Sequence, residues 1–126
     1  MIVRDARNKI VDDYIETTFI KYKIGTGGDS TNPNATDLDS DISGLVSVTP
    51  TLSNESTIEW KFTVNGASYA GNTIKEVGIF NNDGSVMLLR VNYEGIGPLT
   101  SSDDIDFVIV VEVDWWYLMK EKLQHL

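Results

Sequence analysis

The sequence predicts a mainly β protein, an antiparallel β-sandwich with an N-terminal helix and a short C-terminal helical tail. Short segments that alternate apolar and polar residues recur about every ten positions, with turn residues between them. A helical period of three to four residues that extends over more than one turn occurs at the two ends of the chain. The chain has 126 residues, 41% of them hydrophobic, which suits one core. We therefore expect one β-rich domain over residues 1–113 and an aromatic tail over residues 114–126.

The N-terminal segment has the apolar spacing of an amphipathic helix. Apolar residues separated mostly by three or four positions lie on one side of such a helix, and here they are Val3, Ala6, Ile10, Val11, Tyr14 and Ile15. Two threonines at 17 and 18 are weak helix formers, so we expect the helix to end there. Residues 19–24 then alternate as a half-buried strand.

A polar segment follows the first predicted strand. Residues 25–34 have the glycine, asparagine and serine content of a loop. Residues 35–43 fit one helical turn with Thr36 as its N-cap, and this turn would direct Leu38 and Ile42 into the core. The acidic side chains between them would then be solvated.

Two further strands are predicted before the middle of the chain. Residues 45–52 fit a strand in which Pro50 indicates an edge position or an irregularity. Residues 56–64 alternate most clearly, because every second residue is large and apolar. The residues predicted to be buried here are Ile58, Trp60, Phe62 and Val64.

A β-hairpin is the strongest local prediction. Residues 74–80 and 85–93 are apolar strands, and the sequence Asn-Asn-Asp-Gly between them includes Asp83 and Gly84. An Asp-Gly pair supplies the positive φ that tight hairpin turns require. A glycine inside an apolar strand indicates a close approach by another group, so we expect Trp60 to lie over Gly78.

The last strand and the tail complete the predicted elements. Residues 104–113 are apolar on both faces in their middle, which predicts a central strand covered on both sides. Asp114 is a suitable N-cap for a short amphipathic helix. Its apolar side would carry Trp115, Leu118, Met119 and Leu123.

Composition restricts the classes of function. The formal net charge is −9, which opposes nonspecific binding to nucleic acid or to an anionic membrane. No apolar run approaches the roughly 20 residues that span a bilayer, and the first residues lack the apolar stretch of a signal peptide. The chain has no cysteine, which excludes disulfides and thiolate metal sites.

No set of residues predicts a catalytic or metal centre. The single histidine, His125, is next to the C-terminus, where fixed geometry for a general base is not expected. Asp37, Asp39 and Asp41 have the alternate spacing of a calcium loop, but Ile42 stands where the loop glycine belongs. Whether these acids bind calcium stays open, and the alternative is a capped turn with solvated carboxylates.

A glycine-rich segment and two strand glutamates could also indicate a functional site. Residues 25–28 are glycine-rich but lack the lysine of a phosphate-binding loop, and Asp29 would repel phosphate. Glu59 and Glu76 lie on strands, where both fit outward-facing polar positions, and the alternative of a carboxylate pair as in a glycosidase stays open. The sequence therefore predicts a protein that is not an enzyme and that needs no cofactor.

The tail carries the predicted interface. Two tryptophans and a tyrosine in succession cannot all face one side of a helix, so at least one is expected to be exposed in an isolated subunit. Exposed aromatic residues often mark interfaces. The predicted interface residues are Trp115, Trp116, Tyr117 and Leu118. The alternative is that they cap the open end of the sandwich.

The order of these features resembles the tail-collar-fibre and tail-baseplate proteins of tailed viruses. The resemblance spans residues 3–113. Five phrases carry it: IKYKIGTGG at 20–28, TDLDSDIS at 36–43, STIEWKFTV at 56–64, the hairpin with EVGIF, DG and MLLR, and the apolar strand at 107–112. It implies a β-rich virion subunit that is repeated around a symmetry axis, with no cofactor and no catalytic residues.

The expected function is therefore that of a virion structural protein, located in the tail, baseplate or fibre attachment. Its partners would be further copies of itself and other virion proteins. No fibre shaft or receptor-binding tip follows residue 113, which favours a stand-alone piece. The alternatives are a head decoration or neck protein, or a carbohydrate-binding sandwich module in which Tyr69 and Tyr93 stack on sugars.

Overall fold

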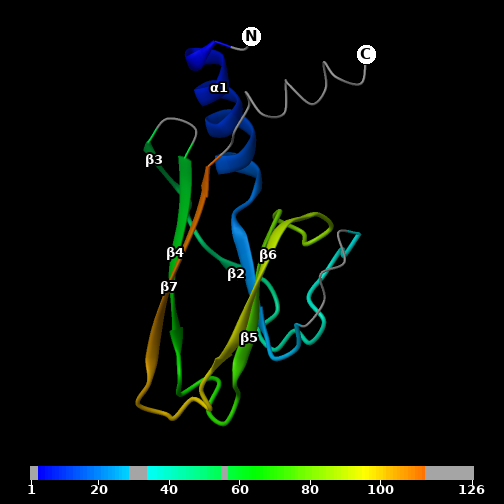
Figure 1. Cartoon of the computed structure of the whole chain (residues 1–126), viewed down its shortest axis with the longest axis vertical. Coiled ribbons are helices and arrows are strands. Elements are labelled where there is room, and N and C mark those ends of the chain that lie inside the picture. Colours follow the sequence, from blue (N-terminus) through cyan, green and yellow to red (C-terminus); the bar gives the residue numbers. More distant parts are fainter. Residues whose placement is uncertain (1–2, 29–33, 55–56, 113–126) are drawn as a thin grey trace.

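The computed structural model describes residues 3–28, 34–54 and 57–112. A short α-helix and a π-helical turn precede the strands along the chain. The elements are α1 (Arg4–Ile10), η1 (Val11–Glu16), β1 (Lys21–Gly25), β2 (Val46–Ser47), β3 (Thr51–Asn54), β4 (Thr57–Asn65), β5 (Ile74–Phe80), β6 (Met87–Ile96) and β7 (Asp104–Glu112). Helical residues lie at one end, and the strands run along the rest of the molecule (Figure 1).

The strands form two antiparallel sheets. Sheet A has the order β2-β1-β5-β6, and sheet B has the order β3-β4-β7. The prediction of a mainly β protein with a sandwich-like arrangement is confirmed. The register is regular through the centre of each sheet: Tyr22 lies opposite Ile79, and Trp60 lies opposite Ile109.

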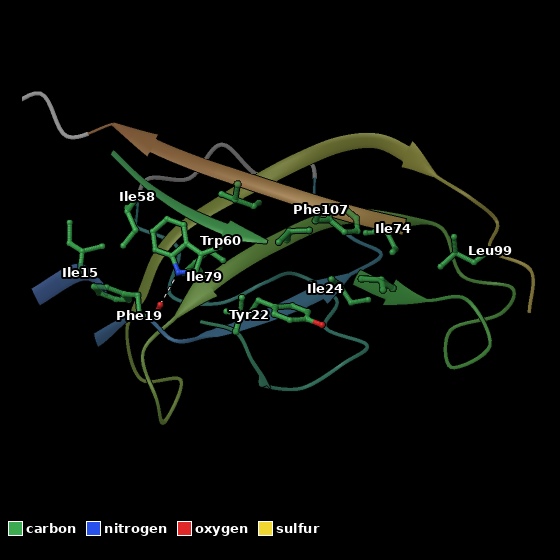
Figure 2. Packing of buried hydrophobic residues seen from close by; sticks show 14 residues of the cluster. Ile15, Phe19, Tyr22, Ile24, Ile58, Trp60, Ile74, Ile79, Leu99 and Phe107 are labelled. Atoms are coloured by element: carbon green, nitrogen blue, oxygen red, sulfur yellow. Dashed lines mark hydrogen bonds between the residues drawn. The ribbon is translucent and has the colours of Figure 1, made fainter. Parts of the chain in front are cut away.

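The core lies between the two sheets because successive residues of a strand point to opposite faces. Trp60 is fully buried, and its indole nitrogen donates a hydrogen bond of 2.8 Å to the carbonyl oxygen of Phe19 (Figure 2). That bond satisfies the one polar group that the tryptophan carries into the core. The predicted alternation of β4 is confirmed, since Ile58 and Val64 are also buried.

An aromatic cluster fills the middle of the core. Tyr22 stacks on Phe62 with ring centroids 3.7 Å apart, and Phe62 stacks on Phe107 at 5.3 Å. Burial, and secondarily the charge of Tyr69, raises the pKa of Tyr22 above its ordinary value. Tyr93 meets Phe107 edge to face at 5.7 Å, and burial raises its pKa too.

The β5–β6 hairpin closes as its sequence predicts. The backbone nitrogen of Asn81 donates to the carbonyl oxygen of Val86 at 3.0 Å, and Gly84 has a φ of 77°. Hydrogen bonds from the side chain and then the backbone of Ser85 lower the pKa of Asp83. The positive φ expected at the Asp-Gly pair is therefore confirmed.

Two predicted elements differ from the structure. Residues 35–43 do not form a helical turn; the Asp37 carboxylate accepts from the next backbone nitrogen, Leu38, at 2.8 Å. Such a local bond to a short acidic side chain competes with helix formation. The predicted strand over residues 45–52 is two strands, because the chain leaves sheet A after β2 and joins sheet B as β3, with Pro50 between them.

The prediction of a central, doubly covered last strand is wrong. β7 pairs with β4 alone among the described strands, so it is an edge strand. Val108 and Val110 are 55% and 54% exposed on its outer side. The apolar pattern of β7 therefore leaves valines on a surface that nothing in the described part of the chain covers.

Candidate functional site

Three of the five phrases that carried the family resemblance meet on the outer face of sheet A, and the other two form β4 and β7 of sheet B. Antiparallel register places Lys23, Gly78 and Arg90 in one row across β1, β5 and β6. The next row on the same face contains Gly25, Glu76 and Asn92. Residues 37–42, which we call the strap, cross this face. Segments far apart in the sequence are therefore brought to one place by the strand order.

The strap is attached to sheet A by backbone hydrogen bonds. The nitrogen of Thr26 donates to the carbonyl oxygen of Ser40 at 3.0 Å, and the nitrogen of Ile42 donates to the carbonyl oxygen of Ile24 at 3.0 Å. Asp41 forms a bridge with Gly25 beside the end of β1. These bonds fix one end of the strap and direct the preceding residues over β5 and β6.

Leu38 fills the space that the missing side chain of Gly78 leaves. A Cβ atom placed on Gly78 would lie 3.0 Å from Leu38 Cδ2 and 2.7 Å from Phe80 Cε2. Leu38 is buried there. The expectation that a large group approaches Gly78 was right about the approach and wrong about the group, because Trp60 packs on the other face of sheet A, in the core.

Two cations on either side of Gly78 hold the strap by its acids. Lys23 Nζ lies 3.1 Å from Asp37 Oδ1 and 3.5 Å from Asp41 Oδ2, and it sits 4.9 Å from the centre of the Phe80 ring. On the other side of the row, the guanidinium of Arg90 lies 3.5 Å from a carboxylate oxygen of Asp39. All three acids of the proposed calcium pattern therefore face basic side chains.

Glu76 is fully buried under the strap, so the prediction that it faces outward is wrong. Its Oε1 accepts a long hydrogen bond of 3.4 Å from the backbone nitrogen of Ser40. Its Oε2 has no hydrogen-bond partner in the part of the chain that the structure describes. Glu59 is half-buried, and its carboxylate pairs with Lys61 at 3.1 Å. The two glutamates lie on different sheets and do not form a pair.

The glycine-rich turn packs against Glu76. A Cβ atom on Gly25 would lie 2.7 Å from Glu76 Cγ and 2.5 Å from the carbonyl oxygen of Ser40. A Cβ atom on Gly27 would lie 2.8 Å from Glu76 Oε2. Side chains essentially never approach so closely, so the glycines at these positions let the turn lie directly on the carboxyl group. The glycines therefore serve packing of the turn.

A shallow depression of about 400 Å³ borders this turn. It is lined by Thr26, Gly27, Gly28, Lys75, Tyr93 and Glu94. Tyr93 is one of the two tyrosines considered for carbohydrate stacking, and its ring also contacts Phe107. Tyr69 packs against the core cluster. The structure thus places Tyr93 at the depression and Tyr69 elsewhere.

The helical end has an exposed apolar surface. Val3 is 60% exposed, Tyr14 is 56% exposed and Ile10 is 37% exposed. By contrast, Ile15 and Phe19 are buried where the helical segment meets the sheets. The predicted interface residues Trp115, Trp116, Tyr117 and Leu118, and also His125, lie outside the described residues.

Sequence reasoning missed the strap and the burial of Glu76. The available signal was an apolar residue, Leu38, between two acids, together with a glycine inside β5. Among the described residues, no three acidic or histidine side chains come together to hold a metal ion, and no helix is long and apolar enough to cross a bilayer. No protein-family model matches the chain, and no curated protein is similar to it in sequence.

Proposed function

We propose that the protein is a non-enzymatic structural subunit of a tailed-virus virion, in the tail, baseplate or fibre attachment. It would act by self-assembly and by docking to other virion proteins. The observation that carries the proposal is the apolar outer side of the edge strand β7, where Val108 and Val110 are exposed. Exposed apolar groups that lie together favour an interface. A head decoration or neck position is an alternative location for the same kind of subunit.

The strap supports this proposal because its polar side chains are used within the fold. Lys23 pairs with acids of the strap, and Leu38 fills the gap over Gly78. Lys23 and Leu38 thus act as anchoring and packing groups, which is what a repeated building block requires. In the same proposal, a C-terminal helical tail presents Trp115, Trp116, Tyr117 and Leu118 to a neighbouring subunit. Association would be driven by burial of these aromatic groups.

The test is the mass in solution, measured by light scattering on the full chain and on a chain that ends at Asp114. The proposal expects an oligomer for the full chain and a smaller species for the shortened one. A matched control replaces the two exposed charges Lys9 and Asp13 by serine and should keep the oligomer. A full chain that stays monomeric at high concentration contradicts the self-assembly proposal.

A carbohydrate-binding module is the second candidate, and the depression beside Tyr93 favours it. That depression also presents Lys75 and Glu94, which can hydrogen-bond to sugar hydroxyls. A glycan screen tests this reading: saturable binding that is lost in Tyr93→Ala and kept in Tyr14→Ala supports the module. Glycan binding that is unchanged in Tyr93→Ala contradicts the carbohydrate-binding proposal.

A further inference from the structure

The N-terminal helical segment carries an apolar stripe that the described residues cover only at one end. We define the stripe as Val3, Ala6, Ile10 and Tyr14, all exposed. Tyr14 makes one edge-to-face contact with Phe19, at 5.9 Å. A helix of this length is marginal in water by itself, and packing of its apolar face normally stabilises it. The stripe therefore needs a covering partner.

The described chain ends at the same end of the molecule as this stripe. β7 pairs with β4 up to Glu112, which lies opposite Thr57. β4 and β3 are also the strands that η1 contacts. Figure 1 shows the last residues of β7 reaching the end of the molecule where α1 lies. The chain beyond Glu112 thus starts at the same end as the stripe and needs no long connection to reach it.

The sequence after Glu112 has the pattern and the length of a suitable partner. Its apolar residues Trp115, Leu118 and Met119 have the spacing of one helical face, while Trp116 and Tyr117 fall on other faces. A helix over residues 114–126 would be about 20 Å long at about 1.5 Å per residue. The consecutive segments α1 and η1, with 7 and 6 residues, match that length.

We propose that residues 114–126 of the same chain pack along the stripe, with Trp115, Leu118 and Met119 covering it. Because the segment is attached directly after β7, its effective concentration at the stripe is high. A second copy would compete for the stripe only at a comparable protein concentration. Packing on the stripe uses Trp115 and Leu118 within the subunit, so the interface of the proposed function narrows to Trp116 and Tyr117. This last assignment rests on the proposed function; the packing on the stripe does not.

Hydrogen–deuterium exchange on the full chain tests the packing. The readout is the exchange of residues 114–126 in wild type and in a variant with Ile10→Ser and Tyr14→Ser. Both substituted side chains are exposed, so the sandwich should remain folded. We expect protected amides in wild type and loss of that protection in the variant. Lys9→Ser is the matched control, because its side chain is 77% exposed outside the stripe, and it should keep the protection.

Three results would overturn the proposal. The first is exchange of residues 114–126 at the rate of an unprotected chain in wild type. The second is protection that survives both stripe substitutions. The third is protection that disappears on dilution, since the segment then lies on a second copy.

Light scattering on the same samples separates this proposal from the proposed function. A monomer in which the stripe substitutions remove the protection of residues 114–126 supports packing on the stripe and contradicts self-assembly. An oligomer in which residues 114–126 stay protected after the stripe substitutions supports self-assembly and contradicts packing of these residues on the stripe.

Discussion

The outer faces of the two sheets differ in whether a segment of the described chain covers them. On sheet A, the strap covers the row that contains Gly78, and Leu38 is buried against it. On sheet B, Val108 and Val110 stand exposed on an edge strand, beside Lys61 and Glu59 of β4. Both faces carry apolar groups, but only one receives a covering segment from the described part of the chain.

The difference shows that residue pattern and burial are separate properties of a strand. The covered face depends on a glycine that makes room and on cations that hold the acids of the strap. The bare face has valines where a covered strand would have them, but no glycine gap or loop from the described residues lies above them. Substitutions should therefore be costly on sheet A and tolerated on sheet B.

The largest effect is expected at Gly78. Gly78→Val would place its Cβ 2.7 Å from the Phe80 ring and 3.0 Å from Leu38, so the strap and the ring would have to move. Overpacking of this kind costs about 1–3 kcal/mol of unfolding free energy. Urea denaturation measures it. An unchanged midpoint would show that the strap yields without cost, and partial rescue by Leu38→Ala in the same chain would identify Leu38 as the group being crowded.

The direct comparison of the two faces is Leu38→Ala against Val108→Ala. Truncating the buried leucine opens a gap over Gly78 and should destabilise the fold by about 2 kcal/mol. Truncating the exposed valine should change stability by no more than about 0.5 kcal/mol. Thermal unfolding of both variants measures the contrast. Equal losses would mean that the face of sheet B is as well packed as that of sheet A.

Local pattern predicted the elements whose partners are adjacent in sequence. The alternation of β4 and the Asp-Gly turn of the hairpin both depend on neighbouring residues, and both were predicted correctly. Glu76 could not be placed in this way, because a segment more than 30 positions away buries it. A carboxylate between apolar residues has the same local pattern whether its face is open or covered.

Gly78 and β7 show two other limits of the sequence. β5 is apolar on both faces, so alternation could not tell that Gly78 faces away from the core that contains Trp60. β7 has the composition of a central strand, yet strand order makes it an edge. Composition reports hydrophobicity, whereas the neighbours of a strand are set by the whole chain.

A smaller effect is expected from the ion pairs of the strap. Lys23→Met keeps most of the side-chain volume over Phe80 and removes the charge that faces Asp37 and Asp41. Because these carboxylates are partly exposed, the loss should be about 1 kcal/mol or less. Lys61→Met is the control: it breaks the pair with Glu59 on sheet B, in which the lysine is 70% exposed, and it should cost less. Urea titrations with and without about 1 M salt measure the unfolding free energy of both variants. Salt screens the ion pair, so the stability difference between wild type and Lys23→Met should become smaller in salt.

The smallest effect is expected from alkaline pH. The folded state holds the Tyr22 proton more tightly than the unfolded chain does, because burial and then Tyr69 raise the pKa of Tyr22. Its contribution to stability is therefore complete below the ordinary tyrosine pKa of about 10 and is lost as the pH rises through the folded-state pKa. Tyr22→Phe should flatten the fall in stability above about pH 10, whereas Tyr14→Phe at the exposed helical end serves as the control. Identical alkaline limbs for wild type and Tyr22→Phe would show that the core admits the tyrosinate without penalty, which would contradict the closed packing of Tyr22 on Phe62.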